Sequence, residues 1–447
     1  MKRVVVIGGV AAGMSAASQI KRRNPDVEVV VLEKTRFVSY GSCGLPYYLS
    51  GLISDPMKLV AIPKEKFITE RKIDVRTQAE AIYINPEKRE VIAKDPNGER
   101  ALMYDKLVIA TGARPSRPDV AGLNSEGIFF MRDLEDGLLI GQFMEKKKPH
   151  SALIYGGGYV AMEMAETFRR LGINLTVVVW DRLMGKEESE IADVIRGELA
   201  GNDVRLEEFC AIKSFERKGD LIRAETDRGS VDADVVLVAT GIVPNSELAK
   251  DAGLKLSIRN SIATDTHQKT SDPEIYSAGD CADALHLVTG KKTWIPLGST
   301  ANKQGRVAGA HIAGEDAEFP GVVGTATFKV FDLEVARTGL TEAFTKSEGF
   351  NVGTEIVDAG SRAHYYPGGK PIKIKLVFDA NSGRLLGAHM AGGEGVSKRI
   401  DVFATALYAK MTIDDVAFLD LSYAPPFAPV WDPVLVAAQV ASKKVKR

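Results

Sequence analysis

The feature that most constrains this chain is a glycine turn set between a short apolar strand and a helix, a combination that occurs twice. The first turn, at residues 8–10, follows a β-branched run at 4–7 and precedes small and apolar residues at helical spacing over 11–23. A second apolar run at 27–32 ends in Glu33. Strand, glycine turn, helix, strand and terminal acid together form the βαβ unit that binds a dinucleotide.

The second copy of this pattern lies in the middle of the chain. An apolar run at 153–155 enters a glycine turn at 156–158, and a helical pattern then leads to a strand at 175–179. Each copy is followed further along by a hydrophobic strand that ends in Ala-Thr-Gly, at 110–112 and at 239–241. Two such units predict two bound nucleotides.

The character of the sequence changes from about residue 325. Residues 328–340 and 372–392 read as strands of an antiparallel sheet, with turn residues at 381–383 and a helical stretch at 396–410. No low-complexity linker separates these regions. We therefore expect an α/β chain with two Rossmann-like nucleotide-binding domains, packed together with a C-terminal α+β domain.

Composition excludes several functions. The 58 basic and 59 acidic residues give a formal net charge of −1, so the basic excess needed for sequence-independent nucleic-acid binding is missing. The first residues resemble a signal peptide, but their glycines argue against one, and no apolar run reaches the ~18 residues of a membrane span. Three scattered cysteines are too few for a disulfide framework or a zinc site. We expect a cytoplasmic protein without metal, nucleic acid or membrane partner.

With both glycine units and both Ala-Thr-Gly strands, the whole chain resembles the FAD-dependent pyridine nucleotide-disulfide oxidoreductases. In that family the first unit binds FAD and the second binds NAD(P)H. The resemblance implies that residues 1–115 and 266–324 are the two parts of an FAD-binding domain. It further implies an inserted NAD(P)H-binding domain at 116–265 and a dimerisation domain at 325–447.

The resemblance also assigns residues to the cofactors. Gly8, Gly9 and Gly13 would place the FAD pyrophosphate at a helix N-terminus, where free N–H groups favour anions. Glu33 would accept hydrogen bonds from the adenosine ribose, and Asp280 would bond the ribityl chain. The full set expected at the two cofactors is Gly8, Gly9, Ala12, Gly13, Glu33, Lys34, Thr111, Gly112, Gly156, Gly158, Tyr159, Val160, Glu163, Gly241, Gly279 and Asp280. Val10 departs from the fingerprint, which has its second glycine there, so its side chain must turn away from the pyrophosphate.

The choice between NADH and NADPH stays open. Val179 ends the second strand of the second unit, where an acid would hold the ribose 2′-hydroxyl of NAD. Beyond it, Arg182 could meet a 2′-phosphate and Asp181 could repel one, or both could be solvated loop charges.

Cys43 follows the first acid, in the segment SYGSCGLPYYLSG. The glutathione and lipoamide branches of the family carry Cys-x4-Cys here, but this chain has Tyr48 in place of the second cysteine and lacks any Cys-x-x-Cys. Residues 39–43 resemble the Ser-Phe-x-x-Cys motif of the single-cysteine branch. That branch contains coenzyme A-disulfide reductases, persulfide and sulfur reductases, and NADH oxidases and peroxidases. Cys210 and Cys281 lie outside any such motif and are interpreted as inert.

The first glycine loop and helix discriminate within this branch. The oxidases and peroxidases carry a histidine where this chain has Ala11, which argues against efficient peroxide reduction. The coenzyme A-disulfide reductases instead place residues for the coenzyme A nucleotide on the first helix. Ser15, Gln19 and Arg22 match those positions and share one helical face. The complete set that the resemblance assigns to substrate is Ser15, Gln19, Arg22, Ser39, Ser42, Arg71 and Asn302.

Two tyrosines of the C-terminal region complete the predicted site. A leaving thiolate needs a proton or a hydrogen-bond donor, and the family supplies tyrosines from the partner subunit. Tyr365 and Tyr423 stand at the matching positions, although Tyr366 could be the inward residue in place of Tyr365. The resemblance therefore implies a homodimer whose active site is shared between subunits.

The resulting hypothesis is a flavoprotein reductase in which a hydride from NAD(P)H passes through FAD to Cys43. The cysteine would reduce coenzyme A disulfide, coenzyme A persulfide or related disulfides and polysulfides through a mixed disulfide with coenzyme A. Three alternatives remain open: an NADH oxidase that reduces oxygen, an electron-transfer reductase for a small redox protein, and a non-enzymatic flavoprotein that senses redox state.

Overall fold

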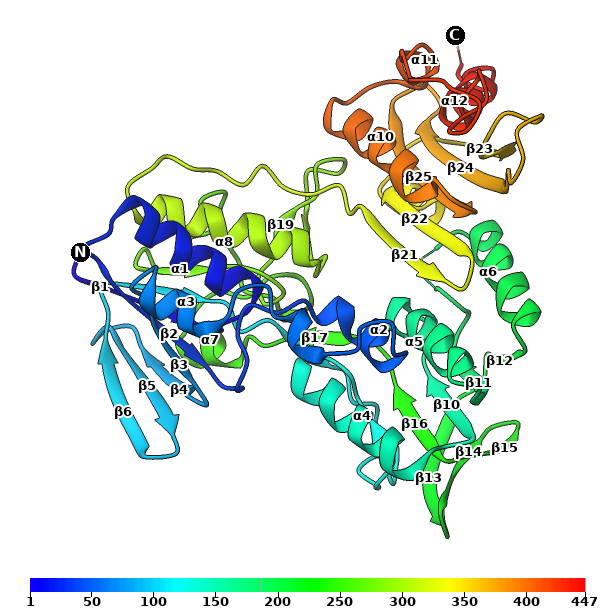
Figure 1. The fold of residues 1–447 in the computed structure, drawn as a ribbon. Helices are drawn as coiled ribbons and strands as arrows, with labels where there is room; N and C mark the ends of the chain where they lie inside the picture. The colour runs from blue at the N-terminus through cyan, green and yellow to red at the C-terminus, as the bar shows by residue number, and fades with distance from the viewer. Residues whose placement is uncertain (186, 447) are drawn as a thin grey trace.

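The structure is a computed structural model that describes residues 1–185 and 187–446 (Figure 1). It contains three sheets of five strands, one for each nucleotide unit and one for the C-terminal region, together with two three-stranded antiparallel sheets. The predicted α/β architecture with a C-terminal α+β part is confirmed. Among the described helices, none combines the length and the apolar character needed to cross a bilayer.

The first nucleotide unit is a parallel sheet in the order β18-β7-β1-β2-β3. Its central strand is buried on both faces, since Val4, Val5 and Val6 have no exposed surface. The strands are β1 (Arg3–Ile7), β2 (Glu28–Glu33), β3 (Asp74–Thr77), β7 (Lys106–Ile109) and β18 (Ile275–Ser277). The accompanying helices are α1 (Ala11–Arg23), α2 (Leu45–Leu49), α3 (Lys64–Thr69) and α8 (Gly298–Ile312).

Helices α1 and α8 lie side by side against this sheet (Figure 1). Glycines of α8 permit the close crossing, because a Cβ on Gly305 would come within 2.2 Å of the Ala12 carbonyl oxygen and one on Gly309 within 2.6 Å of the Ala16 carbonyl oxygen. The first unit is therefore completed by β18 and α8, which lie beyond the second unit in sequence.

The second unit repeats the arrangement, with five parallel strands in the order β12-β11-β10-β16-β9. These strands are β9 (Ile128–Phe129), β10 (Ser151–Tyr155), β11 (Asn174–Val179), β12 (Val204–Glu208) and β16 (Val235–Val238). Its helices are α4 (Leu134–Lys147), α5 (Tyr159–Arg170) and α6 (Ser189–Gly201). The register of β10 on β11 matches that of β1 on β2, which confirms the internal duplication.

Smaller elements decorate both units. One three-stranded sheet is formed by β4 (Glu80–Asn85), β5 (Glu90–Asp95) and β6 (Gly98–Met103), and the other by β13 (Ile212–Lys218), β14 (Leu221–Thr226) and β15 (Gly229–Ala233). The short pairs are β8 (Ala113–Pro115) with β17 (Ile242–Pro244) and β19 (Ala284–Leu285) with β20 (Lys292–Thr293), and α7 spans Glu247–Asp251.

The C-terminal region is an antiparallel sheet in the order β21-β22-β25-β24-β23 with helices packed on it. Its strands are β21 (Ala326–Val330), β22 (Leu333–Gly339), β23 (Val352–Gly360), β24 (Pro371–Asp379) and β25 (Leu385–Gly392). Its helices are α9 (Glu342–Ser347), α10 (Val396–Tyr408), α11 (Ile413–Ala417) and α12 (Pro433–Ser442). The antiparallel sheet and the helix beginning at Val396 agree with the sequence prediction.

Candidate active site

Both predicted glycine turns adopt a backbone that only glycine tolerates. Gly8 has φ +105°, and a Cβ there would come within 2.1 Å of the Ala110 carbonyl oxygen. Gly156 has φ +132°, and a Cβ there would also come within 2.1 Å of a carbonyl oxygen, that of Ala239. In each unit the turn is thus pressed against the Ala-Thr-Gly segment, which explains why the two motifs occur together.

The helices that follow these turns begin without a side-chain cap. The side chain of Val10 before α1 makes no capping hydrogen bond, and Gly158 before α5 supplies none either. The first turns of α1 and α5, both within the described residues, contain no acidic residue. The leading N–H groups and the positive end of each helix dipole are therefore left for an anion. This arrangement fits a dinucleotide pyrophosphate at each turn. Val160, a predicted cofactor contact, follows the second turn and is partly exposed.

Glu33 lies at the carboxyl end of β2 beside the first turn. Its buried carboxylate accepts hydrogen bonds from the Gly9 N–H at 2.7 Å and from the Thr35 N–H and hydroxyl, both at 2.7 Å. These bonds fix the carboxylate next to the turn, and each oxygen keeps acceptor capacity for a ribose hydroxyl.

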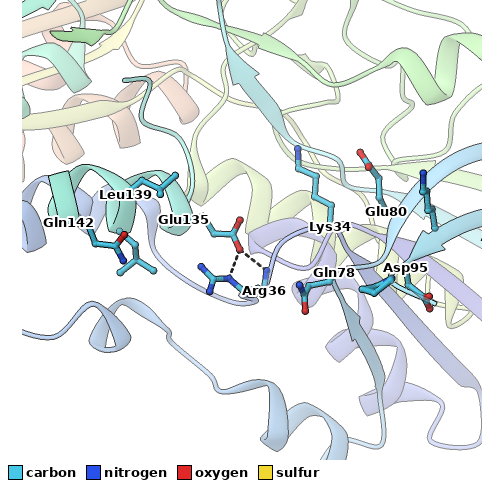
Figure 2. A pocket seen from close by; sticks show the side chains of 11 residues that line it. Lys34, Arg36, Gln78, Glu80, Asp95, Glu135, Leu139 and Gln142 are labelled. Atoms are coloured by element: carbon cyan, nitrogen blue, oxygen red, sulfur yellow. Dashed lines mark hydrogen bonds and ion pairs between the residues drawn. The ribbon is translucent and has the colours of Figure 1, made fainter. Parts of the chain in front are cut away.

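A cavity of about 770 Å³ opens next to this point. Figure 2 shows Lys34, Glu80 and Glu135 on its walls, with Arg36 paired to Glu135 at 2.9 Å. The walls come from the end of β2, the β5–β6 hairpin and α4. Lys34, which lines the cavity, directly follows Glu33 in the chain. The cavity therefore lies beside the Glu33 carboxylate and offers room for the adenosine end of a dinucleotide.

Each Ala-Thr-Gly segment is hydrogen-bonded to residues that follow the other one. The Thr111 hydroxyl donates to the Asn245 carbonyl oxygen at 2.5 Å, and the Asn245 N–H donates to the Gly112 carbonyl oxygen at 2.9 Å. The Ser116 N–H in turn donates to the Gly241 carbonyl oxygen at 2.8 Å. With the β8–β17 pairing, these bonds fix one nucleotide unit against the other.

The Gly279-Asp280 segment meets the first helix. A Cβ on Gly279 would lie 2.9 Å from that of Ala12, so the segment packs directly on the first turn of α1. The Asp280 carboxylate pairs with the Arg132 guanidinium, whose Nε also donates to the Ala113 carbonyl oxygen at 3.1 Å. Arg132 was not predicted from the sequence, because it stands alone before α4 in no recognisable motif.

Cys43 lies in a 3-10 turn, Ser42–Gly44, immediately before α2. Its side chain is exposed, whereas Cys210 and Cys281 are buried, as expected for inert thiols. Although the sulfur is accessible, the surrounding protein removes much of its water, and this raises the pKa of the Cys43 thiol. The charge of Glu163 raises this pKa further and Arg132 lowers it.

Glu163 approaches Cys43 from the second unit. One turn further along α5, the Thr167 hydroxyl donates to the Pro46 carbonyl oxygen at 3.0 Å, which holds this face of α5 against α2. Burial, and then the neighbouring Glu166, raise the pKa of Glu163 to about 7. The carboxylate therefore titrates near neutrality, close enough to influence both Cys43 and Tyr47.

We predict that Glu163→Gln lowers the pKa of the Cys43 thiol. An ionised carboxylate disfavours the nearby thiolate, so its removal lets the thiolate form at lower pH. At pH 8 alkylation of reduced Cys43 by iodoacetamide should be about two- to tenfold faster in the variant. Below about pH 6, where Glu163 is protonated, the two rates should converge. Thr167→Val, which loosens the same helix contact without removing charge, is the control, and superimposable pH profiles for Glu163→Gln and the unmodified protein would contradict the prediction.

Tyr159, the first residue of α5, is packed between the second unit and the C-terminal sheet. Its ring centroid lies 5.0 Å from that of Phe328, and its hydroxyl donates to Glu187 at 3.2 Å. Burial raises the pKa of the Tyr159 phenol. Glu187 is itself buried and bonded to His389 of β25 at 3.1 Å, so this predicted cofactor contact is tied to the C-terminal region.

The predicted substrate residues of α1 form pairs. The Ser15 hydroxyl donates to Asn302 at 2.7 Å across the α1–α8 contact. The Arg22 guanidinium donates to the buried Gln19 amide oxygen at 2.8 Å. The structure thus joins, in two pairs, four of the residues that the sequence assigned to substrate.

Ser18 and Arg71 extend this surface. The Arg71 guanidinium donates to the Ser18 hydroxyl at 2.6 Å, although the two residues are far apart in sequence. Ser18 lies three residues after Ser15 and was missed, because a serine on an amphipathic helix carries no distinguishing signal. At the other end, the Ser39 N–H donates to the Gly9 carbonyl oxygen at 2.9 Å, which brings the segment with Ser42 and Cys43 to the first glycine turn.

The two predicted tyrosines are hydrogen-bonded to each other. The hydroxyls of Tyr365 and Tyr423 are 3.1 Å apart, and this bond raises the pKa of Tyr423. Both side chains are exposed on the single chain, and so is Phe427. Between the two residues that the sequence left open, the structure pairs Tyr365, not Tyr366, with Tyr423.

Comparison with known proteins identifies the class of this fold and site. Residues 2–305 match the pyridine nucleotide-disulphide oxidoreductase family, and residues 325–433 match the dimerisation domain of the same family. The chain belongs to this family, which uses FAD and NAD(P)H. The uncapped turns and the cavity beside Glu33 fit those two cofactors.

Three relatives show where in the family the chain is placed. It is 43% identical over 443 residues to the NAD(P)H coenzyme A polysulfide/persulfide reductase of Pyrococcus horikoshii, and the matched region covers 98% of each chain. It is 31% identical to a coenzyme A disulfide reductase of Staphylococcus aureus, over 96% of this chain and 97% of the relative. The structure of an NAD-dependent persulfide reductase from A. fulgidus matches with a TM-score of 0.96 and 41% identity, over 99% of this chain and 83% of that one.

Proposed function

We propose that the chain is an NAD(P)H-dependent flavoprotein reductase of coenzyme A disulfide, coenzyme A persulfide or related disulfides and polysulfides. The observation that carries this proposal is the exposed Cys43, alone in its segment, at the junction of the first glycine turn and the second nucleotide unit. The expectation of a cytoplasmic location agrees with a mechanism that depends on a free thiol.

The domain boundaries follow from the same proposal. Residues 1–115 and 266–324 hold FAD, residues 116–265 hold NAD(P)H, and residues 325–447 form the dimer interface. Gly8, Gly13 and Glu33 would hold the FAD pyrophosphate and ribose, and Asp280, paired with Arg132, would meet the ribityl chain. Bound FAD supplies the acceptor for the nicotinamide hydride. Gly156, Gly158 and the N-terminus of α5 receive the nicotinamide dinucleotide.

The chemistry at Cys43 begins from its thiolate. The thiolate sulfur attacks one sulfur of the substrate disulfide, so that a bond from Cys43 to substrate sulfur forms and the substrate S–S bond breaks. One coenzyme A thiolate leaves and takes a proton from a tyrosine hydroxyl. Two electrons from NAD(P)H and one proton then cleave the mixed disulfide and release the second thiol, so that each turnover converts NAD(P)H, one proton and one disulfide into NAD(P)⁺ and two thiols.

The proton donors in this proposal are Tyr365 and Tyr423 of the partner subunit. The chain carries a dimerisation domain, and in the single chain both phenols are exposed. Because the mutual hydrogen bond raises the pKa of Tyr423, this phenol stays protonated at neutral pH and can donate. The exposed Phe418, Phe427 and Trp431 on the same C-terminal segment supply apolar surface for the contact.

The oxygen-reducing oxidase has weaker support. Ala11, which begins α1 directly after the first glycine turn, cannot relay a proton, whereas the oxidases and peroxidases that this chain resembles carry histidine there. Such an activity also makes no use of the polar face of α1.

The test of the proposed substrate is to remove the cations of that face. We predict that Arg22→Ala and Arg71→Ala each raise KM for coenzyme A disulfide about tenfold or more, because a hydrogen bond between charged groups contributes about 1.5–3 kcal/mol. KM for a small disulfide without a nucleotide should stay nearly constant, since the lost contacts bind a remote part of the substrate. The control is Arg23→Ala, whose guanidinium pairs with Glu315 instead. Equal effects on both substrates would mean that these arginines are structural.

A further inference from the structure

Three neighbouring strands of the C-terminal sheet place a row of basic side chains against the second nucleotide unit. Arg337 of β22 and Lys375 of β24 each lie in register with His389 of β25, the strand between them. His389 and Lys375 are buried, and the Arg337 side chain is 19% exposed. Because burial of a charged group is costly unless an opposite charge meets it, this basic row requires acidic partners.

Glu187, in the segment that leads into α6, meets the first two members of the basic row. One oxygen of its buried carboxylate lies 3.1 Å from His389 Nδ1, and the other lies 3.2 Å from Arg337 Nε. The oxygen near Arg337 also accepts a hydrogen bond from the Tyr159 hydroxyl at 3.2 Å. Glu187 thus joins the C-terminal sheet to the first residue of α5.

Lys375, the third member of the row, meets the next acids of the same segment. Its ammonium donates to the Glu188 carboxylate at 2.9 Å and to the Glu190 carboxylate at 3.1 Å, and it pairs with Glu342 of α9 at 2.9 Å. Buried ion pairs add little net stability, but they can fix one arrangement of the parts that they join. The basic row is therefore suited to fix residues 187–190 at one place on the C-terminal sheet.

The loop before α6 is also bonded to the second glycine turn. The Met184 N–H donates to the Gly157 carbonyl oxygen at 2.9 Å, and Glu187 holds the Tyr159 hydroxyl one residue beyond Gly158. Tyr159 begins α5, and its N–H is one of the leading groups that are left for an anion. A displacement of Glu187 would therefore be passed to the anion-binding end of α5.

We propose that Glu187 is a positioning residue for the nicotinamide nucleotide, held in place by the basic row. It acts through Tyr159 and not by contact with the nucleotide. The domain assigned to dimerisation thereby also orients the first turn of α5 in the domain assigned to NAD(P)H. This inference rests on the proposed function, in which the second unit binds NAD(P)H.

Glu187→Gln and Tyr159→Phe each remove one partner of the connecting hydrogen bond. In each variant the apparent dissociation constant of the nicotinamide nucleotide should rise at least about fivefold. This constant comes from the rate of flavin bleaching in the FAD-loaded protein at increasing NADH or NADPH. At saturating nucleotide, KM for coenzyme A disulfide should stay within about twofold, because the predicted substrate face lies on α1. The double variant should bind the nucleotide no more weakly than the weaker single variant, since both lose the same bond.

Glu188→Gln is the matched control. It removes the neighbouring carboxylate of the same segment, but Lys375 keeps Glu190 and Glu342 as partners. The bonds of Glu187 are left intact, so the nucleotide constant should stay within about twofold of that of the unmodified protein. If Glu187→Gln does not fold with FAD, Glu187→Asp takes its place, because it keeps the charge that the basic row needs and shortens the reach toward the tyrosine.

The possible results divide clearly. A rise below about fivefold in either folded variant overturns the inference. So do effects that add in the double variant, and so does an equal rise in Glu188→Gln, which would mean that the segment only joins the two domains. If neither nucleotide bleaches the flavin of the unmodified protein, the proposed function fails and this inference fails with it.

Discussion

Cys43→Ser is expected to abolish coenzyme A disulfide reduction, by several orders of magnitude in turnover, while NAD(P)H still bleaches the flavin. The hydroxyl cannot form the mixed disulfide, and neither of the other two cysteines is accessible to replace it. Stopped-flow absorbance measures the flavin step and steady-state thiol release measures the disulfide step. The mass of the intact, unreduced protein supplies a second readout, because one coenzyme A adduct should be present before the substitution and absent after it.

The matched control for this experiment is Cys281→Ser. The Cys281 thiol is buried and donates to the Ile109 carbonyl oxygen at 3.4 Å, a bond that a serine hydroxyl can also make. This variant should keep full disulfide turnover. If Cys43→Ser retains disulfide turnover as well, the chemistry takes place elsewhere. Oxygen consumption that survives in Cys43→Ser would mark the oxidase activity as a side reaction of the reduced flavin.

A mixed dimer tests the sharing of the active site between subunits. Tyr423→Phe chains should be slow in the release of the substrate thiolate, since the phenol that donates to it is lost while its packing is kept. When these chains exchange with Cys43→Ser chains, one site of each heterodimer combines an intact Cys43 with an intact Tyr423. About half of the wild-type activity per heterodimer should therefore return, provided that each site takes its tyrosine across a twofold axis.

The same mixture gives a different result if the tyrosine acts within its own chain. Each site of the heterodimer then lacks one of the two groups, and the activity does not exceed the sum of the two variants. Tyr366→Phe is a further control, because it removes a neighbouring phenol that is not part of the Tyr365–Tyr423 hydrogen bond. This variant should keep full turnover by itself, so it has no defect for subunit exchange to restore.

The parts of the fold that the sequence predicted are those governed by local pattern. The two glycine turns could be located because their φ values and close carbonyl contacts allow no other residue, and their flanking strands are almost entirely apolar. The antiparallel sheet of β4, β5 and β6 was missed because its strands are half exposed and lack a clear alternation. Helix α12 was missed because its ten residues follow a proline-rich segment whose turn character dominates the local sequence.

The candidate site shows the same division. Cys43 could be chosen from its motif, whereas Arg132 could not, because its importance comes from an ion pair with Asp280 that joins segments distant in the chain. The contact of Arg71 with Ser18 is likewise a product of tertiary packing. The influence of Glu163 on the thiol depends on how α5 is docked against α2, and no spacing in the sequence reports that docking.

The crossing of α1 with α8 has a consequence for the order of events during synthesis. Residues 1–115 cannot complete their packing until β18 and α8 leave the ribosome, because the Ala12 and Ala16 turns of α1 remain uncovered until then. The strands and helices of the second unit, by contrast, run without interruption from β9 to β16. All parts of the inserted unit are therefore synthesised first, and the N-terminal strands remain an unfinished sheet until α8, which begins only at Gly298, has been made.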